Sequence, residues 1–358
     1  MGSKTEKRQL MIFAAIAYGI PYLMGFLMWY GYAGQINLSA FPNAQMLYPA
    51  MGVMLAFLLT RKKDGNIPKA FCMSFIVTTL IAIACSVLSV LDSGREVTMP
   101  GGTVSLWLAA IQYVMIIGSI AGLICLLAAG KKKREAYGLR WKNWKASVGC
   151  ILLFLVLYFL RAASGYAFMG EIAAFIDIMK SPQAWITLGI IPLNFVLAYI
   201  AFFGEEYGWR YYLQPFLQKR FGMRRGVLLL GVLWGLWHLP LDFFYYVTPD
   251  SGVVMTVNQI IVCVALGIFM GYVYMKTENI WAVVIIHFLN NNLALVISGE
   301  FSTDALMNQS LSWSDILPAL LLNGVLFGLF IFARQYREKG TAPGQDAENA
   351  RFGVELNE

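Results

Sequence analysis

Residues 185–213 read WITLGIIPLNFVLAYIAFFGEEYGWRYYL, an apolar run that ends in a cluster of ionisable side chains. The apolar part is long enough to cross a bilayer as an α-helix, and we expect that helix to continue through the charged segment. Ionisable groups in lipid are rare and costly, and they usually mark function. Glu206 and Arg210 are four residues apart, so they share a helix face and are expected to pair. Glu205 looks elsewhere and is left for chemistry.

The composition of the whole chain indicates a membrane protein. Of 358 residues, 59% are hydrophobic and 13% are charged. Repeated long apolar runs predict an all-α, polytopic transmembrane helical bundle with about ten spans. The net charge of +7 lies in short loops between spans, which indicates topology signals and no nucleic-acid partner. The runs lie near residues 10–32, 47–60, 70–91, 104–129, 148–163, 185–203, 226–246, 253–275, 280–298 and 316–333.

The distribution of basic residues predicts the orientation of these spans. If the N and C termini are both cytoplasmic, nearly all of the 27 lysines and arginines fall on the inner side, as the positive-inside rule expects. The three exceptions are Arg95, Arg161 and Lys180.

Three regions follow from this pattern. Residues 1–146 are expected to form N-terminal transmembrane helices, about four spans, followed by a basic cytoplasmic linker. Residues 147–335 form a second helical core, and the polar tail 336–358 is expected to be disordered. A short interfacial helix is expected over Glu171–Met179. Three small-residue pairs predict close helix packing: Gly231 with Gly235, Gly267 with Gly271, and Gly324 with Gly328.

The chain contains two histidines, His238 and His287, and both fall inside predicted spans. Trp234 precedes His238 by one helical turn, so its indole can form the wall of a pocket beside the imidazole. His287 and Asn291 likewise share a helix face. Because both histidines lie in membrane helices, alongside a segment with two glutamates, a functional role is favoured over packing.

Other polar residues near these positions are less clearly functional. Asn290 and Asn292 are expected to form hydrogen bonds between helices. Asp242 either orients the imidazole of His238 or faces water near the outer end of its span. The aromatic residues of the charged segment are expected at the membrane interface: Tyr207, Tyr211 and Tyr212.

Three motifs in this order resemble those of the CAAX-protease and bacteriocin-processing (CPBP, or Abi) family of intramembrane endopeptidases. The motifs are Glu205-Glu206-x-x-x-Arg210, Trp234-x-x-x-His238 and His287-x-x-x-Asn291. The resemblance covers residues 185–299, and Trp234 stands where phenylalanine is the commoner aromatic residue. It implies a CPBP-type protease core within residues 147–335, in the bilayer of a prokaryotic plasma membrane. The substrate would be a membrane-associated, lipidated or leader-type peptide or protein reached from the cytoplasmic side.

The resemblance also implies the site, for which two schemes remain open. In the first, Glu205 and His238 activate a water, while His287 and Asn291 stabilise the oxyanion. In the second, which fits the usual description of the family as metalloproteases, Glu205, His238 and His287 bind zinc. The implied catalytic residues are Glu205, Glu206, Arg210, His238, His287 and Asn291, with Trp234 in the substrate pocket.

A rival interpretation assigns no catalysis to the same polar cluster. Buried Glu, Arg and His side chains also serve ion paths, so a transporter, or a scaffold or immunity protein, is the alternative. The polar groups gather in three late spans without an inverted repeat, which argues against a transporter. A scaffold should keep its cellular effect when Glu205 is replaced by Gln, whereas an enzyme should lose it.

Overall fold

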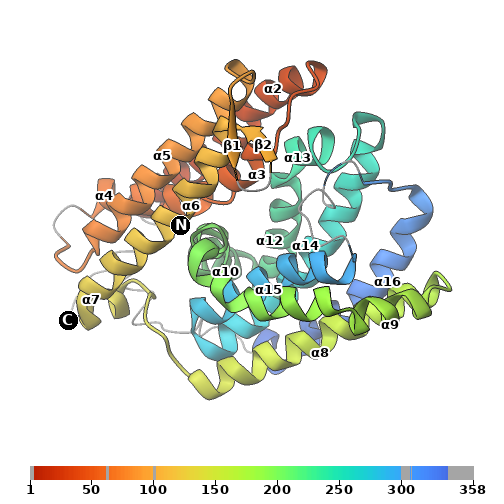
Figure 1. The fold of residues 1–358 in the computed structure, drawn as a ribbon. Helices are drawn as coiled ribbons and strands as arrows, with labels where there is room; N and C mark the ends of the chain where they lie inside the picture. The colour runs from red at the N-terminus through yellow and green to blue at the C-terminus, as the bar shows by residue number, and fades with distance from the viewer. Residues whose placement is uncertain (1–3, 62–63, 100–101, 300–306, 308, 338–358) are drawn as a thin grey trace. The chain divides into compact units, whose positions relative to one another are not determined.

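The computed structural model describes residues 4–61, 64–99, 102–299, 307 and 309–337. Apart from connecting turns and one short hairpin, this part of the chain is helical (Figure 1), which confirms the all-α prediction. It contains nine helices that are long and apolar enough to cross a membrane, so the protein is an integral, multi-pass membrane protein. They are Lys4–Ala33, Ala40–Thr60, Lys69–Leu91, Leu106–Ala128, Trp144–Phe168, Pro182–Phe221, Met223–Phe244, Pro249–Thr277 and Ile280–Ile297. Nearly all of the predicted tail, residues 338–358, lies outside the described residues.

The last predicted span is shorter than expected. Its α-helix, α16 (Ile316–Leu326), has 11 residues and gives way to a 3₁₀ stretch, η6 (Gly328–Phe332). Phe327 and Phe330 both pack against Phe269, with ring centroids 5.5 Å and 4.9 Å apart. These ring contacts hold the end of α16 against its neighbour, where a span over residues 316–333 was predicted.

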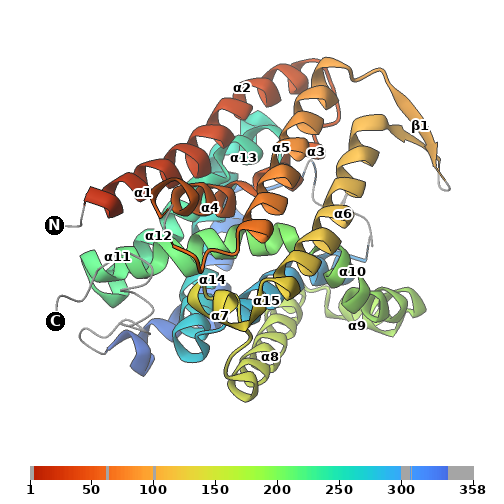
Figure 2. The ribbon, with the colours of Figure 1, turned by 90° about the vertical axis from the view of Figure 1, so that its left-hand side faces the viewer.

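The hairpin was not predicted. Strand β1 (Glu96–Met99) pairs antiparallel with β2 (Gly102–Ser105), and Glu96 lies opposite Ser105. Four-residue strands are too short for a clear alternation of polar and apolar residues. Figure 2 shows β1 beyond the ends of α5 (Lys69–Leu91) and α6 (Leu106–Ala128), which the hairpin connects.

The chain forms two compact units, each described by itself. Of the described residues, those up to Arg140 and Leu197–Tyr212 form the first unit, and Trp141–Val196 and those from Leu213 onward form the second. The division falls within one long helix, α10 (Pro182–Glu206).

The first unit is a bundle of the N-terminal spans around the end of α10. Helices α5 and α6 run side by side (Figures 1 and 2). They approach closely because Gly118 of α6 lies against Thr78 of α5 and leaves no room for a Cβ atom. Its remaining elements are α1 (Lys4–Ala14), η1 (Ala15–Gly19), α2 (Ile20–Ala33), α3 (Ala40–Gln45), α4 (Tyr48–Thr60) and α7 (Gly130–Ala136).

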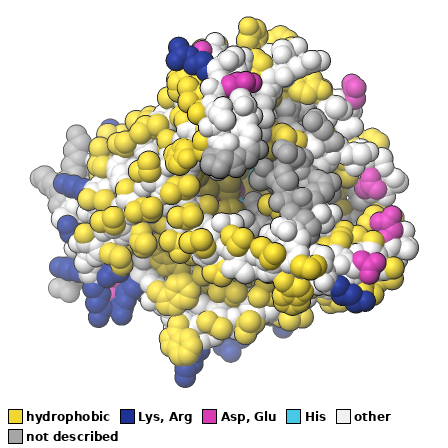
Figure 3. Space-filling model, in the orientation of Figure 1, with side chains coloured by type: hydrophobic (Ala, Val, Ile, Leu, Met, Phe, Trp, Pro, Cys, Tyr) yellow, Lys and Arg dark blue, Asp and Glu magenta, His cyan; other side chains and the backbone are white. Residues whose placement is uncertain are grey.

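The surface of this unit fits a bilayer. Lys and Arg side chains gather over α7, whose sequence is GKKKREA, whereas apolar side chains cover much of the drawn face (Figure 3). Such a basic segment next to a span is typical of a cytoplasmic anchor.

The second unit is built around the crossing of α12 (Met223–Trp237) and α14 (Gly252–Thr277). A Cβ atom at Gly231 would lie 2.5 Å from Val264 Cα, and one at Gly235 would lie 2.7 Å from Ile260 Cα. An added Cβ atom at Gly267 would lie 3.7 Å from Gly231 Cα, and one at Gly271 would lie 2.6 Å from the Tyr336 hydroxyl oxygen. The first two predicted small-residue pairs therefore pack against neighbouring elements. The third does not, since Gly324 has no atom within 4 Å. The other elements are α8 (Trp144–Phe168), α9 (Ile172–Lys180), α11 (Gln214–Phe221), α13 (Leu239–Phe244), η3 (Pro249–Ser251), α15 (Ile280–Ile297), η5 (Trp313–Asp315) and η7 (Arg334–Tyr336).

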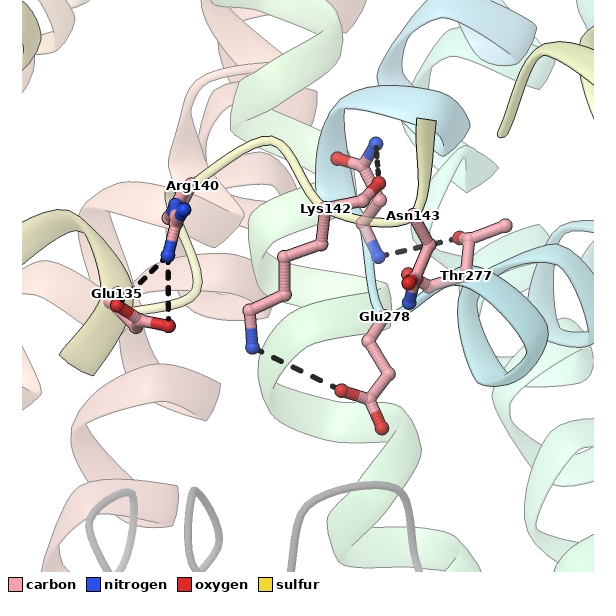
Figure 4. A network of polar contacts seen from close by, with 7 residues as sticks. Glu135, Arg140, Lys142, Asn143, Thr277 and Glu278 are labelled. Carbon is pink, nitrogen blue, oxygen red and sulfur yellow. Dashed lines mark hydrogen bonds and ion pairs between the residues drawn. The ribbon is translucent and has the colours of Figure 1, made fainter. Parts of the chain in front are cut away.

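Helix α9 confirms the short helix predicted in the loop after α8. A polar network joins the start of α8 to the turn between α14 and α15 (Figure 4). Asn143 Nδ2 donates to the Thr277 carbonyl at 2.9 Å, and Lys142 Nζ lies 3.9 Å from a Glu278 carboxylate oxygen. This network fixes the turn that begins α15, the helix carrying the third motif.

Candidate functional site

The first motif lies where α10 changes its winding. The helix continues beyond Glu206, as predicted, but as a π-helix over η2 (Tyr207–Leu213). Segments of π-helix are rare and frequently occur at functional sites. The change of winding therefore places the motif on an irregular segment of a membrane helix.

Glu206 and Arg210 form the predicted ion pair. The Nε atom of Arg210 lies 3.3 Å from Oε2 of Glu206, and both side chains are 0% exposed. Removing one member of a buried pair typically costs about 3–5 kcal/mol, because the other charge stays buried. The pair therefore contributes a balanced charge at the end of α10.

Glu205 has a partner that the sequence analysis missed. The indole Nε1–H of Trp209 donates to Glu205 Oε2 at 3.3 Å. Glu205 and Trp209 are four residues apart, and this is the same spacing that predicted the Glu206–Arg210 pair. Trp209 is 0% exposed, and its ring contacts those of Phe13 and Tyr18, with centroids 5.9 Å and 5.8 Å away.

Two glycines let the motif approach the N-terminal spans. A Cβ atom at Gly204 would lie 2.9 Å from Leu47 Cα, and one at Gly208 would lie 3.0 Å from the carbonyl carbon of Pro49. Only glycine allows such a close approach of two backbones. The turn from α3 to α4 and the start of α4 therefore pack directly against the glycines on either side of Glu205 and Glu206.

The tyrosines of this segment are not interface aromatics, so that prediction was wrong. Tyr207, Tyr211 and Tyr212 are at most 3% exposed. Tyr207 and Tyr211 stack with centroids 4.4 Å apart, and the Tyr207 hydroxyl donates to the carbonyl of Tyr137. These three side chains are instead buried and pack inside the first unit.

The second motif lies at a break between two helices. α12 ends at Trp237, and α13 begins after His238 with Pro240 in its first turn, which cannot continue the hydrogen-bond ladder of α12. His238 Nδ1 lies 2.9 Å from the Trp234 carbonyl oxygen. A carbonyl only accepts, so Nδ1 carries the hydrogen, and Nε2 of the neutral ring carries the lone pair.

Trp234 contacts both histidines of the chain. Its ring centroid is 6.2 Å from that of His238 and 5.5 Å from that of His287, the second contact being edge-to-face. The two imidazoles are 7% and 4% exposed. One indole therefore brings the second and third motifs together within the second unit.

The third motif lies on α15, where neighbouring amides order Asn291. Asn290 Nδ2 donates to Asn291 Oδ1 at 3.0 Å. This bond fixes the orientation of the Asn291 amide, in which Oδ1 faces Asn290 and the donor Nδ2 lies on the other side. Asn292 Nδ2 donates to the Phe288 carbonyl of its own helix. The expected hydrogen bonds between helices are therefore replaced by bonds within α15.

Asp242 does not face water, since it is 0% exposed. It also does not orient His238 through Nδ1, because that nitrogen is bonded to the Trp234 carbonyl. Neither interpretation of this residue from the sequence is confirmed.

The candidate residues fall into two sets. Glu205, Glu206 and Arg210 belong to the first unit, and the two histidines with their neighbours Trp234 and Asn291 belong to the second. Within either unit, the described residues contain no group of three His, Cys, Asp or Glu side chains that could hold a metal ion.

Comparisons with known proteins agree with the three motifs. Residues 185–293, which include all three, match the family model described as type II CAAX prenyl endopeptidase Rce1-like. The chain is also 26% identical over 234 residues to CAAX prenyl protease 2 of Methanococcus maripaludis, an alignment that covers 63% of this chain and 82% of the relative. No solved structure matches. The three motifs, the family model and the archaeal relative therefore agree that this chain is similar to CAAX-type membrane proteases.

Proposed function

We propose that the protein is an intramembrane endopeptidase that hydrolyses a peptide bond in a membrane-associated substrate reached from the cytoplasmic side. A prenylated peptide is the preferred substrate class, because the family description and the name of the archaeal relative both refer to prenylated CAAX substrates. Other lipidated peptides and leader peptides belong to the same proposal. The proposed location is the plasma membrane of a prokaryote, a choice that the archaeal relative supports.

One observation carries this proposal most directly. The Trp234 carbonyl holds the Nδ1 hydrogen of His238, and the Trp234 ring contacts both imidazoles. A histidine fixed in that tautomer presents a basic Nε2 atom, which a general base or a metal ligand requires.

In the proposed reaction, Glu205 and His238 Nε2 orient a water and take its proton as the oxygen attacks the scissile carbonyl. The protonated base then gives that proton to the leaving amine. The Nδ2 hydrogens of Asn291, together with His287, donate to the oxyanion of the tetrahedral intermediate. Asn290 supports this role because it occupies Oδ1 of Asn291 and so keeps the donor end available.

The same residues also fit zinc chemically. Glu205, His238 and His287 provide the two imidazoles and one carboxylate found in many catalytic zinc sites, and the fixed tautomer of His238 leaves the nitrogen that a metal would need. When bound there, zinc would polarise the scissile carbonyl and lower the pKa of a bound water. Asn291 would then be the remaining side-chain donor to the oxyanion.

Cleavage by the purified full chain tests this proposal. A farnesylated peptide ending in a C-a-a-X sequence and a library of membrane peptides would be incubated with wild type, Glu205→Gln and His238→Ala, and the products identified by mass spectrometry. We expect fragments from wild type alone. Loss of cleavage with a chelator and recovery with zinc would select the metal scheme. Cleavage that survives both substitutions would contradict the assigned residues, and a wild type that cleaves nothing would favour the scaffold.

A further inference from the structure

We propose that the first membrane span is part of the catalytic apparatus, because it holds the Trp209 indole that positions the Glu205 carboxylate. This inference rests on the proposed function, in which Glu205 is a catalytic residue. Nothing in the family match points to it, since the span (Lys4–Ala33) lies outside residues 185–293. All the contacts that carry it lie within the first unit.

The first step is the hydrogen bond from Trp209 to Glu205. Nε1 of Trp209 lies 3.3 Å from Oε2 of Glu205, which is 2% exposed. A carboxylate on a flexible side chain needs such a donor to select one rotamer and to define which oxygen faces the reaction. Trp209 is therefore a positioning residue, and it acts through Glu205.

The second step is the packing that fixes the indole. Phe13, at the end of α1, meets the Trp209 ring edge-to-face at an interplanar angle of 89°, and Tyr18, in η1, meets it at 60°. Phe13 also contacts the ring of Tyr212 at 5.0 Å. Phe13 and Trp209 are 1% and 0% exposed, so the indole has no room to rotate away from Glu205.

The third step is the attachment of the first span to α4. A Cβ atom at Gly52 of α4 would lie 3.1 Å from the Phe13 carbonyl oxygen and 3.3 Å from Phe13 Cα. Pro49, one turn earlier in α4, lies against Gly208 of η2. Helix α4 thus packs against Phe13 and against Gly208, the residue before Trp209, which fixes Phe13 relative to the segment that carries Trp209.

Two variants separate the hydrogen bond from the packing. Trp209→Phe keeps a ring but removes the N–H donor, whereas Phe13→Leu keeps the donor but weakens its support. Trp185→Phe is the matched control, because Trp185 lies on α10 but is 63% exposed. With a farnesylated C-a-a-X reporter peptide, we expect Trp209→Phe to lower kcat about ten- to a hundredfold, the range for a hydrogen bond to a charged group, with KM within about twofold. Trp185→Phe should leave both constants unchanged.

A spectroscopic measurement tests the contact without activity. The full chain with ¹⁵N-labelled tryptophan contains 10 indole groups, and the Trp209 signal is the one lost in Trp209→Phe. We expect this signal to move in Glu205→Ala and also in Phe13→Leu, while the Trp185 signal stays in place. If the chemical shift of the Trp209 indole is unchanged in Glu205→Ala, the hydrogen bond is refuted. If it is unchanged in Phe13→Leu, the role of the first span is refuted. If wild type cleaves no peptide, the proposed function fails, and the indole signals still decide this inference.

Discussion

Replacing Gly231 by Ala should separate the two helices at the centre of the second unit. The new Cβ atom would lie 2.5 Å from Val264 Cα and 2.9 Å from Val264 Cγ2, whereas ordinary contact begins at 3.4 Å. One of these contacts is with the backbone of α14, so a side-chain rotation cannot relieve it. Helices α12 and α14 must therefore move apart by about 1 Å, the difference between 2.5 Å and 3.4 Å.

The cost follows from two opposing effects. Overpacking of this kind destabilises a protein by about 1–3 kcal/mol, whereas replacing glycine by alanine in a helix stabilises it by up to about 1 kcal/mol. We therefore expect a net loss of about 1–2 kcal/mol for Gly231→Ala. Because α12 also carries Trp234 and ends one residue before His238, cleavage activity should fall as well.

Gly324→Ala provides the matched control. Gly324 also begins a G-x-x-x-G pair in an apolar helix, but no atom lies within 4 Å of its added Cβ. The assay is the unfolding midpoint of the full chain in detergent, with cleavage measured on the same samples. Equal stability of Gly231→Ala and Gly324→Ala would refute the close crossing of α12 and α14.

Three further predictions concern stability. Arg210→Met should destabilise the chain by about 3–5 kcal/mol, and adding Glu206→Gln should restore most of that loss, because the uncompensated charge is then removed. Tyr137→Phe should cost about 1 kcal/mol near neutral pH, since the Tyr137 hydroxyl donates to Asp64 at 2.6 Å. Burial, followed by that hydrogen bond, raises the pKa of Tyr137, so its stabilising effect is present below the unfolded pKa of about 10 and is lost as the pH rises above it. Phe269→Ala should cost about 3–5 kcal/mol, because the rings of Phe154, Phe327 and Phe330 all contact it.

Unfolding midpoints in detergent check all three predictions, and a different result would contradict each one. A double variant no more stable than Arg210→Met alone would contradict the account of the ion pair. For Tyr137→Phe, the difference from wild type should shrink above pH 10, and Tyr113→Phe is the control because that residue is 51% exposed. An unchanged midpoint in Phe269→Ala would mean that the end of α16 does not depend on this aromatic cluster.

The sequence predicted most of the helices because spans are set by long apolar runs, and these are visible without tertiary contacts. It failed where tertiary packing decides local structure. The end of α16 follows ring contacts with Phe269. Among the buried tyrosines of η2, Tyr207 bonds to Tyr137 and Tyr212 contacts Phe13, both distant in sequence. The small-residue pairs show the same limit, since only the partner helix distinguishes Gly231 from Gly324.

The candidate site was predictable as far as local spacing extends. Four-residue spacing predicted the Glu206–Arg210 pair, and it would also have found the bond between Trp209 and Glu205 had the indole been considered as a donor. The packing of Phe13 against Trp209 joins residues almost two hundred positions apart, so no local pattern carries it. No local pattern in the sequence therefore linked the N-terminal spans to the first motif, whereas the structure places Phe13 and Tyr18 against Trp209.

In the proposed reaction, Glu205 and His238 act together on one substrate. This joint action is tested by kcat/KM for the farnesylated reporter peptide with wild type, Glu205→Gln, His238→Ala and the double variant. Residues that act as one unit are strongly non-additive, so the double variant should lose about as much activity as either single variant. Losses that multiply in the double variant would show that the two residues act independently, and would contradict the account.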